Sequence, residues 1–289
     1  MPRKKDSKIA VSRPALLSAC AVLFLLGQAK PPALPADLNQ ASLRVSALGT
    51  LYDFDLAPEQ LRSLRTAAAK TASTQHRTAV KANADLAKAL ADFQAALLTS
   101  KDDAAIAKAR THVTEVSSDV DLDDDVMPTE AALAQAPAVR KQLKASQIAA
   151  FLASHADQVA DPEEMLLAEL DGIRDTRAEG GASAKTDAAN LTTDTAVSVS
   201  YLVFGTDDAK AKPLATQITA WLNAAAALDD KDFAAQRTAR QDAAKKMIGD
   251  VDPMAVLSHW LDLQIAQLLS NPELPAAIDA TIAARAAQK

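Results

Sequence analysis

The sequence predicts an all-α fold, an elongated array of helix hairpins in two halves with no sheet. Three observations lead to this prediction. Nearly a quarter of the residues are alanine, the strongest helix former, whereas aromatic residues make up only 3%. Apolar residues recur every three or four positions over most of the chain. Prolines and capping residues stand where these periodic segments begin.

The first 29 residues have the features of a secretory signal peptide. Basic residues precede an apolar run over residues 15–26, and the small residues Gly27 and Ala29 precede the expected cleavage site. The run is shorter than the about 20 residues that cross a bilayer. We therefore expect cleavage near Ala29, a periplasmic or secreted location, and no stable membrane insertion afterwards. Cys20 lies in a lipobox-like sequence, so a lipoprotein is the alternative.

Cleavage would remove the only cysteine and make the chain more acidic. Five of the 31 basic and one of the 37 acidic residues lie in residues 1–29, so the net charge would fall from −6 to −10. Such a charge disfavours nucleic acid as a partner. The rest of the chain is long enough for two units. We expect a proline-rich linker over residues 30–50, then helical halves over residues 51–179 and 182–289, divided at Gly180-Gly181.

The first predicted helix is the longest. Residues 59–99 contain neither glycine nor proline and follow Pro58, a residue suited to the first turn of a helix. Apolar residues at helical spacing begin with Leu61 and Leu64. We therefore expect one helix of about 40 residues, which would be roughly 60 Å long.

The later helices are predicted from their start signals. We expect helices that begin near Ser100, Pro128, Val139, Asp161, Thr186, Pro213, Lys231, Asp252 and Pro275. Pro137 should end the short helix that Pro128 begins, and the helix from Val139 should reach His155. Residues 195–204 alternate in a way that also fits a strand. A lone strand would have nothing to pair with, so we expect a helix there.

A half-repeat occurs in the first predicted half. Residues 56–60 (LAPEQ) and 143–147 (LKASQ) each place leucine and glutamine four positions apart, and each precedes an amphipathic helix. The pair resembles the doubled LTxxQ signature of the Spy and CpxP family of periplasmic helical proteins, over roughly residues 50–175. Both copies lack the threonine of that signature. The alternative is that both motifs are simply helix starts.

The resemblance implies a thin, curved helical cradle that binds unfolding clients or responds to envelope stress without ATP. It implies protein partners, and the long first helix could pack across a homodimer. The client-binding residues that it implies follow the two motifs: Gln60, Leu61, Leu64, Gln147, Ile148 and Phe151. A purely structural or interaction role is the alternative function.

An acidic segment suggests a second class of function. Asp119, Asp121, Asp123, Asp125 and Glu130 fall at positions 1, 3, 5, 7 and 12 of an EF-hand loop, the spacing that binds Ca²⁺. Position 6 holds Asp124 where the loop requires glycine for a sharp turn, and Leu122 stands at position 4. From the spacing, a calcium-binding module is the alternative hypothesis for the function. The other interpretation of this segment is a solvated acidic turn between two helices.

No catalytic motif stands out. The four histidines, His76, His112, His155 and His259, lack the spacing of metal ligands, and there is no nucleophile elbow, phosphate-binding loop or dinucleotide fingerprint. We therefore predict a non-enzymatic protein without a cofactor, apart from the Ca²⁺ alternative. An enzyme whose site is assembled from scattered helix residues is the third hypothesis.

Overall fold

The structure, a computed structural model, describes residues 32–74, 80, 83–100, 102–120, 122, 126–155, 159 and 161–288. This part of the chain forms thirteen α-helices and contains no strand, which confirms the all-α prediction. The expected signal peptide, with Cys20 and Ala29, lies outside the described residues.

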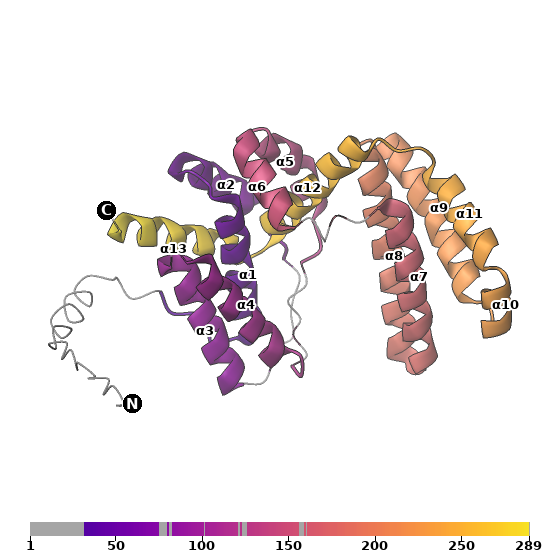
Figure 1. Ribbon diagram of the computed structural model, residues 1–289, viewed down its shortest axis with the longest axis horizontal. Coiled ribbons are helices and arrows are strands. Elements are labelled where there is room, and N and C mark those ends of the chain that lie inside the picture. The colour runs from indigo at the N-terminus through magenta and orange to yellow at the C-terminus, as the bar shows by residue number, and fades with distance from the viewer. Residues whose placement is uncertain are drawn as a thin grey trace, which may run out of the picture.

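The helices form two groups, each around its own hydrophobic core (Figure 1). The first group consists of α1 (Leu38–Phe54), α2 (Pro58–Thr71), α3 (Ala84–Thr99), α4 (Asp103–Ser117), α5 (Glu130–Arg140), α6 (Ala145–Ser154), α12 (Pro253–Ser270) and α13 (Leu274–Ala287). The second group consists of α7 (Pro162–Glu179), α8 (Gly181–Phe204), α9 (Asp208–Ala226), α10 (Asp230–Ala235) and α11 (Arg237–Ile248).

The division between the two cores differs from the division that the sequence suggested. Gly180 is the single residue between α7 and α8, Gly181 begins α8, and these two helices pack against each other. The chain leaves the first group after α6, builds the second group, and returns through α12 and α13. The second core is therefore a continuous insertion, and the C-terminal helices complete the first core.

Residues 38–54 form a buried helix where we expected a linker. Asp37 begins α1, because its side chain accepts hydrogen bonds from the backbone N–H groups of Asn39 and Gln40. Leu43 and Leu51 are each only 1% exposed. The linker prediction was therefore wrong from Leu38 onward. Pro32 and Pro35 drew the prediction, whereas Asp37 was the signal that mattered.

The prediction of a single long helix over residues 59–99 was also wrong, because α2 ends at Thr71 and α3 begins at Ala84. Tertiary hydrogen bonds hold the end of α2. The Thr71 hydroxyl donates to the carbonyl of Leu269 at 2.8 Å, and the Ser73 N–H donates to the carbonyl of Ser270 at 2.7 Å. The chain therefore leaves the helix to pair with the end of α12.

Two prolines lie inside helices that we expected them to delimit. Pro137 lies within α5, which continues to Arg140, and the next helix begins only at Ala145. Pro213 lies within α9, which begins at Asp208. The helix that we expected to begin near Lys231 is interrupted at Gln236, between α10 and α11. The strand alternative over residues 195–204 is resolved in favour of helix α8.

Helix α8 of the second group packs against helix α12 of the first group. Gly205 ends α8 with φ +58°, and a Cβ atom there would lie 2.6 Å from Nε2 of His259. His259 bonds to the neighbouring backbone, with Nδ1 2.8 Å from the carbonyl oxygen of Leu202. Only glycine permits both the positive φ and this close approach. The packing of α8 against α12 therefore includes a close approach between Gly205 and His259 that only glycine allows.

Candidate functional site

The two L-x-x-x-Q motifs, 87 residues apart, meet through their glutamines. Nε2 of Gln60 donates to Oε1 of Gln147 at 3.0 Å, and Nε2 of Gln147 donates to Oε1 of Gln60 at 3.1 Å. The two side-chain amides thus form a reciprocal pair. The spacing of each motif predicted a helix start, and the fold brings the two helix starts together.

Each glutamine also caps the helix to which it belongs. Oε1 of Gln60 accepts the N–H of Ala57 at 2.8 Å, and Oε1 of Gln147 accepts the N–H of Lys144 at 2.8 Å. These bonds satisfy backbone groups that the start of a helix leaves free. A capping box has two hydrogen bonds, one to the side chain that precedes the helix and one to the glutamine. The glutamine bond forms in both motifs without the threonine of the signature.

The same amides cross to the partner motif's backbone. Nε2 of Gln60 donates to the carbonyl of Gln142 at 2.7 Å, and Nε2 of Gln147 donates to the carbonyl of Asp55 at 2.8 Å. Asp55 is the one residue other than glycine with positive φ (43°) in the described part of the chain. Gln147 therefore helps to hold the sharp turn between α1 and α2.

The apolar residues predicted to bind clients lie mainly in the core. Leu61 is 0% exposed, Leu64 is 2% exposed and Phe151 is 1% exposed, whereas Ile148 is half-buried. In the folded protein, the first three offer almost no surface to a partner. Their role here is to pack the helices on which the glutamines stand.

Aromatic rings extend this packing at the end of α1. Phe54 and Phe151 stack with their ring centroids 4.0 Å apart and an angle of 5° between the rings. The His155 ring also stacks on Phe151, with the centroids 4.3 Å apart. Nε2 of His155 lies 3.5 Å from Oδ2 of Asp53. Trp260 of α12 approaches Phe151 at 6.0 Å. The corner at residues 53–55 therefore packs against Phe151 and His155 at the end of α6, and Phe151 packs in turn against Trp260 of α12.

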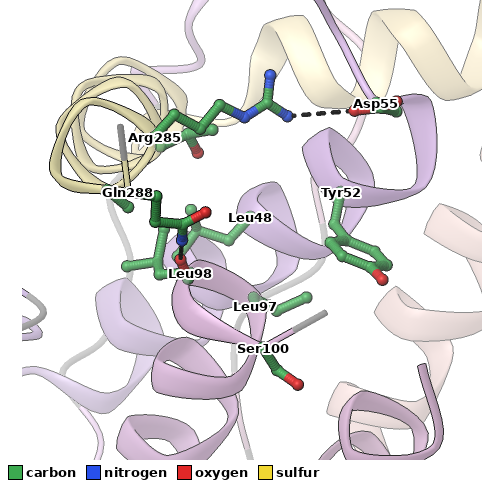
Figure 2. A pocket seen from close by; sticks show the side chains of 10 residues that line it. Leu48, Tyr52, Asp55, Leu97, Leu98, Ser100, Arg285 and Gln288 are labelled. Carbon is green, nitrogen blue, oxygen red and sulfur yellow. Dashed lines mark hydrogen bonds and ion pairs between the residues drawn. The ribbon is translucent and has the colours of Figure 1, made fainter. Parts of the chain in front are cut away.

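A cavity of about 400 Å³ lies beside this corner, between α1, α3 and α13 (Figure 2). Its lining includes three leucines that are at most 8% exposed: Leu48, Leu97 and Leu98. Polar side chains from Tyr52, Asp55 and Arg285 line it as well. These helices are far apart in the sequence, so sequence patterns did not point to the cavity. The arrangement joins apolar surface to polar and charged groups.

Two polar contacts order this lining. Nη2 of Arg285 lies 3.5 Å from Oδ1 of Asp55, the pair joined by a dashed line in Figure 2, and its Nη1 donates to the carbonyl of Leu56. The Tyr52 hydroxyl donates to the Asp103 carboxylate. This hydrogen bond and partial burial raise the pKa of Tyr52 to about 12, because both favour the neutral phenol.

The proposed calcium ligands fall largely outside the described residues. Asp121, Asp123 and Asp125 are not described, whereas Asp119 and Glu130 are both exposed. Glu130 opens α5, which Thr129 caps by accepting the N–H of Ala132. In the described part of the chain, no three Asp, Glu, His or Cys side chains gather closely enough to hold a metal ion. Calcium binding stays a prediction from spacing.

A buried ion pair that sequence reasoning missed joins α5 to α12. Nε of Arg140 donates to Oδ1 of Asp262 at 2.7 Å, and the Asp262 side chain is 3% exposed. Burial raises the pKa of Asp262, and the Arg140 guanidinium opposes that shift. The nearby Tyr201 hydroxyl is buried without a hydrogen-bond partner among the described residues. We assign the Arg140–Asp262 pair to the packing of α5 against α12, which lie side by side.

The fold and the cavity define a class of protein: an all-helical protein whose candidate site is a cavity with leucines and an ion pair in its lining. No known protein family, curated protein or solved structure matches this chain. No helix in the part of the chain described above is long and apolar enough to cross a bilayer.

Proposed function

We propose that this chain is an exported, non-enzymatic helical protein that binds other proteins in a chaperone-like manner. The observation that carries the proposal is the cavity between α1, α3 and α13. The apolar part of its lining that remains accessible, from Leu97, Leu98 and Ala284, suits an apolar side chain of a partner. Tyr52 and the Asp55–Arg285 pair supply hydrogen-bonding groups for the partner's backbone.

In this proposal the two motifs position the site and do not contact the client. Gln147 donates to the Asp55 carbonyl, and Asp55 forms the ion pair with Arg285 at the cavity. Gln60 holds Gln147 through the reciprocal amide pair. The motif glutamines therefore act on the cavity through the α1–α2 turn.

The test is whether the full chain suppresses aggregation of a client protein without ATP, with aggregation measured by light scattering. Ala284 is half-buried and lines the cavity, whereas its neighbour Ala283 is exposed and does not. Ala284→Phe should fill the cavity and reduce suppression, and Ala283→Phe should leave it unchanged. Circular dichroism and thermal unfolding of both variants establish that each retains the fold.

Two results would contradict the proposal. The full chain could fail to suppress aggregation at ratios near one to one, which would remove the chaperone-like function. Alternatively, Ala284→Phe and Ala283→Phe could suppress equally well while both stay folded, which would remove the cavity as the binding site.

A further inference from the structure

A second cavity, of about 170 Å³, lies in the other helix group between α7, α10 and α11. Two arginines line it and a third lies nearby, in a chain whose net charge is −6. Arg237 and Arg240 line it directly, and Arg174 lies on the far side of the Phe233 ring. A gathering of cations in an acidic protein requires a physical explanation.

The Phe233 ring lies between two guanidinium groups. Cζ of Arg240 is 3.4 Å and Cζ of Arg174 is 3.8 Å from the ring centroid. Arg174 has a carboxylate partner, because its Nη2 lies 2.7 Å from Oδ1 of Asp230. Arg240 instead donates to the carbonyl oxygen of Phe233. The stacking fixes the position of the Arg240 guanidinium without neutralising its charge.

The charges near Arg240 are poorly balanced. Burial, together with repulsion from Arg174 and Arg237, lowers the pKa of Arg240, and Asp171 is the group that opposes the shift. Arg237 is exposed and forms no hydrogen bond or ion pair with any described residue. Two guanidinium groups therefore line one cavity with a single carboxylate, Asp171, between α7 and α11.

We propose that this cavity binds a small soluble oxyanion, a phosphate or carboxylate group, between the guanidinium groups of Arg237 and Arg240. Guanidinium groups donate in a planar fork that matches such oxyanions. The Gln241 side chain, which also lines the cavity, adds an amide donor. The cavity is smaller than the roughly 300 Å³ of sites for drug-sized ligands, so a small ion fits it better. This site is separate from the cavity of the proposed function.

The experiment is calorimetric titration of the full chain with inorganic phosphate, repeated with succinate to distinguish the two sources of oxyanion. Sodium chloride at matched ionic strength corrects for screening. Arg237→Gln removes a side chain that forms no hydrogen bond or ion pair with any described residue, so the fold should persist while phosphate affinity falls about tenfold. Lys246→Gln is the matched control, because it removes one exposed cation from the same helix outside the cavity lining.

A variant with the opposite sign completes the test. Asp171→Asn removes the carboxylate from the cavity and should tighten binding of whichever oxyanion binds, which general destabilisation cannot do. Saturable binding of phosphate or succinate, weakened by Arg237→Gln and not by Lys246→Gln, would support the site and identify its ligand. No saturable binding of either anion, or equal weakening by both glutamine variants, would overturn it. So would weaker binding in Asp171→Asn.

Discussion

At the scale of single residues, two glutamines do more than their sequence context indicates. Each accepts the N–H that begins its own helix and pairs with the other glutamine. The spacing of Gln60 and Gln147 from their leucines predicted helix starts, and this is confirmed. Their pairing could not be read from the sequence, because it depends on α6 docking against the end of α1.

Gln60→Ala and Gln147→Ala should each lower the free energy of unfolding by about 1–2 kcal/mol, through the lost cap and the unpaired amide. Because the amides bond to each other, the double variant should lose less than the sum, by about 0.5 kcal/mol or more. Denaturant unfolding of all four proteins measures this coupling. Gln217→Ala, an exposed glutamine on α9, is the control. Strictly additive losses would show that the pair is not formed in solution.

Tyr52→Phe removes the hydrogen bond to Asp103 and should cost less than about 1 kcal/mol, because the contact is near the surface. The raised pKa of Tyr52, about 12 against 10 in the unfolded chain, stabilises the fold fully below pH 10. That contribution is lost as the pH rises from about 10 through about 12. The difference in stability between wild type and Tyr52→Phe should therefore shrink over this interval. A difference that stays constant would contradict the assignment.

At the scale of elements, helix ends decide where the chain turns, and local signals predicted only some of them. Asp161 and Asp252 cap α7 and α12 as expected, by accepting N–H groups of their first turns. The ends that were missed depend on distant partners. Thr71 ends α2 by bonding to Leu269 of α12, which periodicity within residues 59–99 could not reveal.

Gly205→Ala tests the connection between α8 and α12. Alanine at φ +58° is strained, and its Cβ would lie 2.6 Å from Nε2 of His259. We expect a loss of about 2 kcal/mol or more in the free energy of unfolding. Gly249→Ala is the matched control, because Gly249 has φ +70° with no atom within 4 Å of the added Cβ. It should cost only about 1 kcal/mol. Equal losses would mean that His259 moves aside freely.

At the scale of the whole molecule, burial patterns indicated which residues lie inside but not which core they join. Trp260, Leu261 and Ile265 read as one apolar helix, and the fold packs this helix against α5, α8 and α2 rather than against α11, which precedes it in the sequence. The α1–α3–α13 cavity was hidden from sequence reasoning for the same reason. The all-helical class required no such information, because alanine content and helical spacing are local properties.

Because the molecule has two hydrophobic cores, we expect each core to unfold locally without the other. Ile218→Ala, at a 0% exposed position of the second core, should cost about 2–5 kcal/mol. Amide hydrogen exchange should then accelerate mainly in α7, α8 and α9, with α1 to α3 much less affected. Leu61→Ala, at a 0% exposed position of the first core, should give the reverse pattern. Uniform acceleration in both variants would show that the molecule opens as one unit.

The measurement that tests the central claim most directly is amide hydrogen exchange of the full chain with and without an unfolded client protein. The account predicts slower exchange at the end of α1, at the end of α3 around Leu97 and Leu98, and along α13. Exchange in α9 and α11 should be unchanged. Protection confined to other helices would contradict the assignment of this cavity as the binding site. So would the absence of protection at a ratio of chain to client at which the chain suppresses light scattering by the client.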